Sequence, residues 1–143
     1  AWTQRQVDRH KEQSKNELLA IWSNTFENFK ALLPKIPQPT ISQFVFDQVT
    51  HEHDIRHAIS QPGARDSRAI AVAEGFVRDL IARNPDPEIN ALADSPIIGF
   101  DFVRSFTGRR SKAQIAELGL PAETVAAFIR TSPFDIPAES IVE

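Results

Sequence analysis

The sequence predicts an all-α protein. Several segments place apolar residues three or four positions apart, which is the spacing of one face of a helix. Residues that commonly cap helices precede these segments, and prolines or glycines follow them. The strict alternation of apolar and polar residues that indicates a strand is almost absent.

The first two helices are predicted from their polarity, their apolar spacing and a capping box. Residues 3–12 are polar and favour a short, peripheral helix. Ser14 followed by Glu17 is a capping box, the paired side-chain arrangement that begins many helices. The helix that it opens keeps its apolar spacing down to Pro34, which cannot continue it.

Two further helices follow the proline-rich connection. Thr40 can cap a helix over residues 41–59, which stops before a Pro-Gly pair. Asp66 or Ser67 can cap the next helix, whose apolar residues continue to about Arg83.

The remainder of the chain is expected to be less regular. Residues 84–99 contain three prolines and are predicted to be a loop with a short extended piece. From about residue 96 we expect a small helical extension of a single domain, residues 1–143. Its short helices begin near Phe100, Ser111 and Leu120-Pro121, before an irregular tail.

Composition and charge exclude several classes of function. The net charge of -3 and the pI near 5.8 provide no basic surface for nucleic acid or for an anionic membrane. No apolar run approaches the roughly 18–20 residues that span a bilayer, and no secretion signal is visible, which favours the cytoplasm. The lack of cysteine excludes disulfides and thiolate nucleophiles.

The predicted helix over residues 41–59 carries three of the four histidines. At 100° per residue, Asp47, His51 and Asp54 fall together at the edge of an apolar arc. His53 and His57 fall on the opposite side, which is expected to face solvent. The apolar arc, expected to face the core, contains Ile41, Phe44, Val45, Ile55 and Ile59.

Asp47 and His51 are four positions apart, so their side chains meet on one helix face. A carboxylate and an imidazole at this spacing suit a divalent metal such as Zn²⁺. Asp54, one turn further on, is then expected to orient the imidazole from behind. The alternative is a plain Asp–His hydrogen bond at the core edge. His53 and His57 have the same spacing on the solvated side.

A second polar feature is the stretch from Gly108 to Ser111 between two short helices. Backbone amides at a helix start, together with the guanidinium groups of Arg109 and Arg110, could hold the carboxylate of a cofactor or substrate. The alternative is a solvated turn whose arginines pair with nearby acids.

Four stretches together resemble one family. Residues 47–63 and residues 102–114, with Trp2–Val7 and Glu17–Leu19, look like the mycothiol-dependent maleylpyruvate isomerase-like family. That family belongs to the DinB-like helical bundles. The resemblance covers nearly the whole chain, and the stretch 47–63 is its most specific part.

The resemblance implies a DinB-like four-helix bundle that holds a divalent metal, usually zinc. The family ligands are a histidine on an early helix, then an acid and a histidine four apart, which match Asp47 and His51. Here the acid is Asp rather than Glu. The early helix has no counterpart, and His10 lies in a different helix. We therefore expect an N-terminally incomplete bundle and an incomplete metal site.

In function, the resemblance implies a metal that activates the thiol of mycothiol, or of a related cofactor, for addition to a small unsaturated acid. The expected activity is a transferase or isomerase. Two alternatives are a non-catalytic helical binding or stress-response domain of the same fold, and an unrelated metal hydrolase using Asp47 and His51. Because a missing helix leaves apolar residues uncovered, we also expect a homo-oligomer or a companion fragment. The residues concerned are Trp22, Phe26, Phe44 and Ile55.

Overall fold

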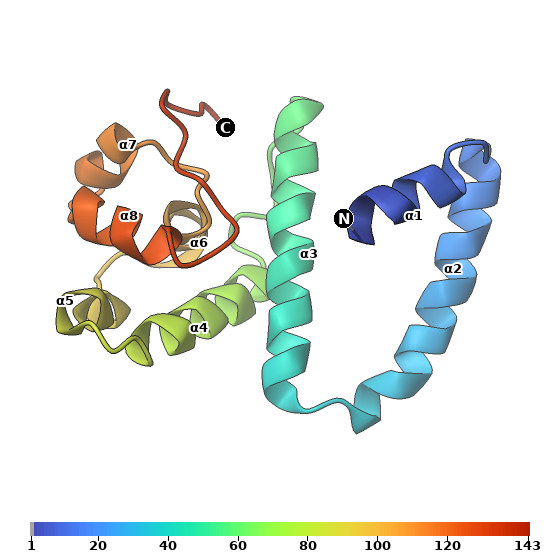
Figure 1. The fold of residues 1–143 in the computed structure, drawn as a ribbon, viewed down its shortest axis with the longest axis horizontal. Coiled ribbons are helices and arrows are strands. Elements are labelled where there is room, and N and C mark those ends of the chain that lie inside the picture. The colour runs from blue at the N-terminus through green and yellow to red at the C-terminus, as the bar shows by residue number, and fades with distance from the viewer. Residues whose placement is uncertain (1) are drawn as a thin grey trace. The chain divides into compact units, whose positions relative to one another are not determined.

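The computed structural model describes residues 2–143, and every regular element in this range is a helix (Figure 1). The all-α class is thus confirmed. The chain divides into two compact units, Ala1–Pro37 and Gln38–Glu143, which are described separately below. Within the described range, no helix is both long and apolar enough to cross a lipid bilayer.

The first unit contains α1 (Trp2–His10), α2 (Lys15–Leu32) and a 3-10 turn, η1 (Leu33–Lys35). The predicted capping box is confirmed, because the Ser14 hydroxyl accepts from the Glu17 amide at 3.3 Å while the Glu17 carboxylate accepts from the Ser14 amide at 2.7 Å. None of the side chains at positions 4–37 is buried. The exposed large apolar residues of this unit are Val7, Leu18, Leu19, Ile21, Trp22, Phe26 and Leu32.

The second unit begins with two long helices, α3 (Gln38–Ala58) and α4 (Arg68–Ala82). Ser67 caps α4, which is one of the two predicted caps. The predicted cap of α3 is wrong. Helix α3 already begins at Gln38, so Thr40 lies inside its first turn. Pro39 is tolerated there because N–H groups in the first turn have no intrahelical acceptor, and proline therefore loses no hydrogen bond.

The stretch predicted as a loop, residues 84–99, is instead mostly helical, with α5 (Pro87–Asn90) and η2 (Ala91–Asp94). The Asp86 carboxylate caps α5 by accepting from the Glu88 amide at 2.9 Å. Arg78 of α4 then holds the following segment, since its guanidinium donates to three backbone carbonyls. These belong to Ala93, Ser95 and Ile97.

The helices expected to form an extension supply most of the buried core instead. Figure 1 shows α6 (Gly99–Phe106), α7 (Lys112–Glu117) and α8 (Ala122–Ile129) gathered on one side of α4. Their apolar side chains pack with those of α4, α5 and η2. This cluster consists of Val77, Ile81, Ile89, Leu92, Phe102, Phe106, Ile115, Leu120, Val125, Phe128 and Ile129.

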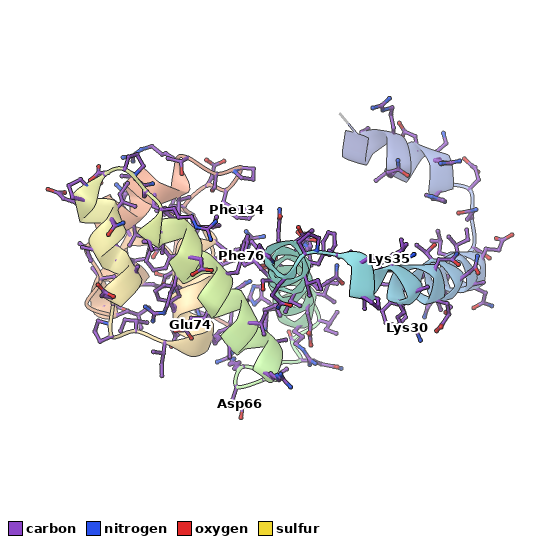
Figure 2. The ribbon with its side chains drawn as sticks, turned by 90° about the horizontal axis from the view of Figure 1, so that it is seen from below. Lys30, Lys35, Asp66, Glu74, Phe76 and Phe134 are labelled. Carbon is purple, nitrogen blue, oxygen red and sulfur yellow. The ribbon has the colours of Figure 1, made fainter. Side chains whose placement is uncertain are left out.

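Helix α3 packs against α4 and α6 through a second, smaller cluster. Phe46 of α3 meets Phe76 of α4 with ring centroids 5.2 Å apart, and Figure 2 labels Phe76 where the two helices approach. Val49 of α3 is buried with residues of α4 and α6. The cluster contains Val49, Ile70, Ala73, Phe100 and Val103.

The predicted core-facing side of α3 is largely wrong, although Val45 does pack against this second cluster. Phe44, Ile55 and Ile59, placed in the apolar arc, are 40%, 60% and 56% exposed, whereas Val49, Thr50 and His53 are buried. The physical reason is that α4 and α6 cover the other side of the helix, and tertiary packing rather than the apolar pattern of one helix decides burial.

Candidate functional site

Asp47 and His51 lie together on an exposed turn of α3. The Asp47 Oδ1 atom is 3.6 Å from the His51 Nε2 atom, and the two side chains are 61% and 63% exposed. No group of three or more potential ligands that could hold a metal occurs among the described residues. A catalytic zinc site takes about three protein ligands, so this pair alone does not complete one. The metal-binding role of Asp47 and His51 stays a prediction.

His53, predicted on the solvated side, is instead buried at 5% exposure. Its ring meets that of Phe100 edge to face, with centroids 4.7 Å apart. Burial lowers the pKa of His53, and the nearby Arg104 charge lowers it further. A neutral imidazole at this position offers one donor and one acceptor to whatever lies beside it.

Asp54 contacts two arginines rather than His51. Its Oδ1 accepts from Arg104 Nη1 at 2.8 Å and its Oδ2 accepts from Arg109 Nη2 at 2.7 Å. Burial acts to raise the pKa of Asp54, but the hydrogen bonds from Arg109 and Arg104 outweigh it and the pKa is lowered. Asp54 therefore joins α3 to the turn after α6, and its expected role behind His51 has no contact to support it.

Arg104 is the residue that the sequence analysis did not assign. It lies within the apolar run of α6 and its side chain is 2% exposed. Arginine is almost never fully buried without a partner, so its position between Val103 and Phe106 was the signal that carboxylates had to meet it. Those carboxylates come from Asp54 and from Glu143 in the tail.

Glu143 lies between two buried guanidinium groups. It accepts closely from Arg104 Nη2, and from Arg110 Nη1 at 2.5 Å. The side chains of Glu143 and Arg110 are only 5% and 9% exposed. Burial acts to raise the pKa of Glu143, but the hydrogen bonds from Arg104 and Arg110 outweigh it, so its pKa is lowered. Asp101 also pairs with Arg110, at 3.3 Å.

The stretch from Gly108 to Ser111 thus binds carboxylates of the chain itself. Arg109 pairs with Asp54 and Arg110 pairs with Glu143, as the second reading of this turn expected, although Arg110 is buried rather than solvated. Ser111 caps α7. Whether either arginine also binds a cofactor stays a prediction.

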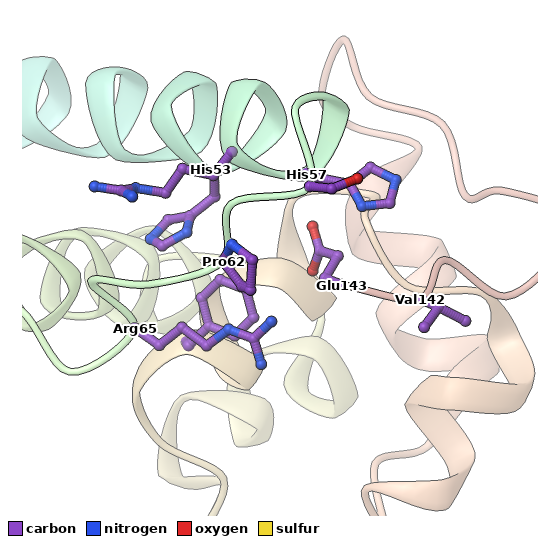
Figure 3. Close-up of a pocket in the computed structure, with 9 residues that line it drawn as sticks. His53, His57, Pro62, Arg65, Val142 and Glu143 are labelled. Carbon is purple, nitrogen blue, oxygen red and sulfur yellow. The ribbon is translucent and has the colours of Figure 1, made fainter.

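Beside this cluster lies a pocket of about 240 Å³. Arg65 stacks over one of its walls, with the guanidinium carbon 4.8 Å from the ring centroid of Phe100. Arg56 already pairs with Glu52 at 2.8 Å. Figure 3 shows Glu143 reaching toward the space between α3 and Arg65. The lining residues are His53, Arg56, His57, Ser60, Pro62, Arg65, Phe100, Val142 and Glu143.

Comparison of the chain with family models, with curated proteins and with solved structures found no match.

Proposed function

We propose that this chain is the DinB-like helical part of a metal- and thiol-dependent transferase or isomerase, with mycothiol or a related thiol as cofactor, acting on a small unsaturated acid. The motif over residues 47–63 supports the choice of reaction class. The pocket beside α3 is the observation that carries the proposal, because its size and charge suit a small acid.

The pocket combines one apolar wall with convergent polar groups, which is typical of small-molecule sites. At about 240 Å³ it is just below the usual range for drug-sized ligands and suits a small metabolite. Arg65 has no carboxylate within ion-pair distance among the described residues, so its charge is available to a ligand. Guanidinium–carboxylate hydrogen bonds are among the strongest in proteins.

In this proposal Asp47 and His51 are two ligands of the metal, and the remaining ligands come from outside this turn of α3. Both side chains are exposed, so they are accessible to such donors. A divalent metal bound there would lower the pKa of the cofactor's thiol, so that the thiol is deprotonated at neutral pH. The binding of the acid in the pocket does not depend on this metal.

A second candidate is a non-catalytic helical binding domain of the same fold. The exposed apolar side chains of α2 favour it, since Trp22 is 68% and Phe26 is 50% exposed. The two candidates differ in catalysis: only the enzyme would convert an unsaturated acid in the presence of zinc and mycothiol.

Titration of the protein with maleate, followed by calorimetry, tests the acid site. We expect Arg65→Gln to weaken maleate binding up to about fivefold, since Arg65 is exposed and an exposed guanidinium–carboxylate pair contributes about 0.2–1 kcal/mol. Arg83→Gln is the matched control, because Arg83 is exposed at the end of α4 and does not line this pocket. Equal maleate affinity in wild type and Arg65→Gln would exclude the proposed site.

A further inference from the structure

We propose that Arg104 and Arg110 form a second carboxylate subsite of this pocket, which Glu143 occupies in the structure and which a small dicarboxylate takes by displacing the tail. The inference rests on the proposed function, because it extends the acid site that Arg65 begins. In this arrangement the tail competes with a small dicarboxylate for the two buried arginines.

The subsite is already built as a carboxylate receptor. Arg104 donates to Glu143 through both Nε, at 3.2 Å, and Nη2, a two-pronged arrangement that matches carboxylate geometry. Arg110 adds a third hydrogen bond through Nη1. Both guanidiniums are at least nine-tenths buried, so water competes little for the anion they hold.

The subsite and the pocket share one wall. Three guanidinium carbons surround the ring of Phe100, with Arg65 at 4.8 Å, Arg110 at 5.5 Å and Arg104 at 5.9 Å from its centroid. Glu143 also lines the pocket, as Figure 3 shows. Withdrawal of the Glu143 side chain would therefore join the two spaces and open the buried arginines to a ligand.

Glu143 can leave without stranding a buried charge. Arg104 keeps its ion pair with Asp54 at 2.8 Å, and Arg110 keeps Asp101 at 3.3 Å. An unpaired buried cation costs several kcal/mol, so these remaining partners make the exchange of one carboxylate for another feasible. The incoming carboxylate would restore the same hydrogen bonds.

Few other contacts hold residues 140–143 within the described part of the chain. The Gln114 side chain makes two hydrogen bonds to the backbone of Ile141, at 2.7 and 3.1 Å, and Ser111 contacts Ser140 at 3.1 Å. Val142 is 85% exposed. A tethered group of this kind acts as an intramolecular competitor at an effective concentration in about the millimolar range. A ligand that has a second carboxylate for Arg65 should therefore bind more tightly than the Glu143 side chain alone.

The charge favours a dianion. When Glu143 withdraws, Asp54 and Asp101 remain as the carboxylates of the cluster. These two negative charges offset two of the four guanidinium groups of the pocket and the cluster, so two positive charges are left for the ligand. One ligand carboxylate replaces that of Glu143, and the other meets Arg65. The four guanidiniums are those of Arg65, Arg104, Arg109 and Arg110.

Succinate binding to Glu143→Ala tests the inference, with Glu139→Ala as the control because Glu139 is an exposed acid of the same tail. We expect Glu143→Ala to bind succinate at least about tenfold tighter than wild type, since removal of the tethered competitor frees the subsite. Glu139→Ala should bind as wild type does. Inorganic phosphate is the second probe, and an equal gain for phosphate would overturn the assignment to dicarboxylates.

A second measurement uses the wild-type chain and so does not depend on the variant folding. Saturation with succinate should move the backbone amide NMR signals of Ile141, Val142 and Glu143 toward unstructured positions. Unmoved signals, or a folded Glu143→Ala protein whose succinate affinity is unchanged or lower, would overturn the inference. The effect of Arg65→Gln on maleate binding tests the proposed function separately, because that substitution leaves Glu143 and its two arginines unchanged.

Discussion

Arg104 shows how a single residue determines the surroundings of the candidate site. Its charge is buried in α6, and it therefore requires carboxylates from elsewhere in the chain. Asp54 provides one from α3 and Glu143 provides the other from the tail. Because removing one partner of a buried ion pair costs far more than the pair contributes, Arg104 specifies which turn of α3 lies against α6.

Gly108 allows the backbone of the tail to approach the turn after α6 closely. Its φ is +70°, and a Cβ at this position would lie 2.3 Å from the carbonyl oxygen of Asp135. We expect Gly108→Ala to destabilise the fold by about 1–3 kcal/mol from the backbone conformation alone, and by more because of the clash. Thermal unfolding of the variant and of wild type measures the difference.

Gly75 provides the matched control for this substitution. It lies within α4, and a Cβ there would meet nothing within 4 Å. Gly75→Ala should therefore stabilise the protein by about 0.5–1 kcal/mol, since alanine loses less backbone freedom in a helix. A Gly108→Ala protein as stable as wild type would contradict the described contact between Gly108 and the tail.

At the scale of elements, the sequence predicted where most helices lie but not which side of α3 is buried. Local signals such as the Ser14–Glu17 capping box and the Ser67 cap depend on neighbouring residues, so they were readable. The burial of α3 depends on α4 and α6, far away in the sequence. The polar residues Gln48 and Glu52 of α3 lie on the side that was expected to face the core, and both are exposed.

The same limit applies to the candidate site. The sequence identified Asp54, Arg109 and Arg110 as chemically important, and the structure brings all three into one ionic cluster. It could not identify their partners, because Arg104 and Glu143 are separated from Asp54 by 50 and 89 positions, and only tertiary packing joins them. Residues 84–99 were misjudged for a related reason, since Arg78 organises them from α4.

Helix α3 also carries the metal prediction. The isolated chain should bind zinc weakly, because Asp47 and His51 are two donors where about three are needed. We expect a chelator to remove the zinc readily, and His51→Ala to abolish the remaining binding. His57→Ala is the control on the same helix. Stoichiometric zinc that resists the chelator would show a third ligand, and His10 would then be the first residue to substitute.

At the scale of the whole molecule, apolar side chains remain exposed on both units. In the first unit, Trp22 and Phe26 of α2 are 68% and 50% exposed, and in the second unit Phe44 and Ile55 of α3 are 40% and 60% exposed. Isolated exposed apolar residues are common, but several on one helix indicate a surface that gains free energy when covered.

We therefore predict that the chain self-associates into a homodimer in a concentration-dependent manner. Ile55→Asp should weaken the association about tenfold or more, because the substitution removes apolar area and places a charge where water would be excluded. Ile98→Asp is the matched control, since Ile98 is 71% exposed but lies outside the long helices, just before α6. Sedimentation velocity over a dilution series measures the mass of each protein. A wild-type chain that stays monomeric and folded at every concentration would exclude the dimer. Equal loss of association in both variants would show instead that exposed apolar residues associate without a defined interface.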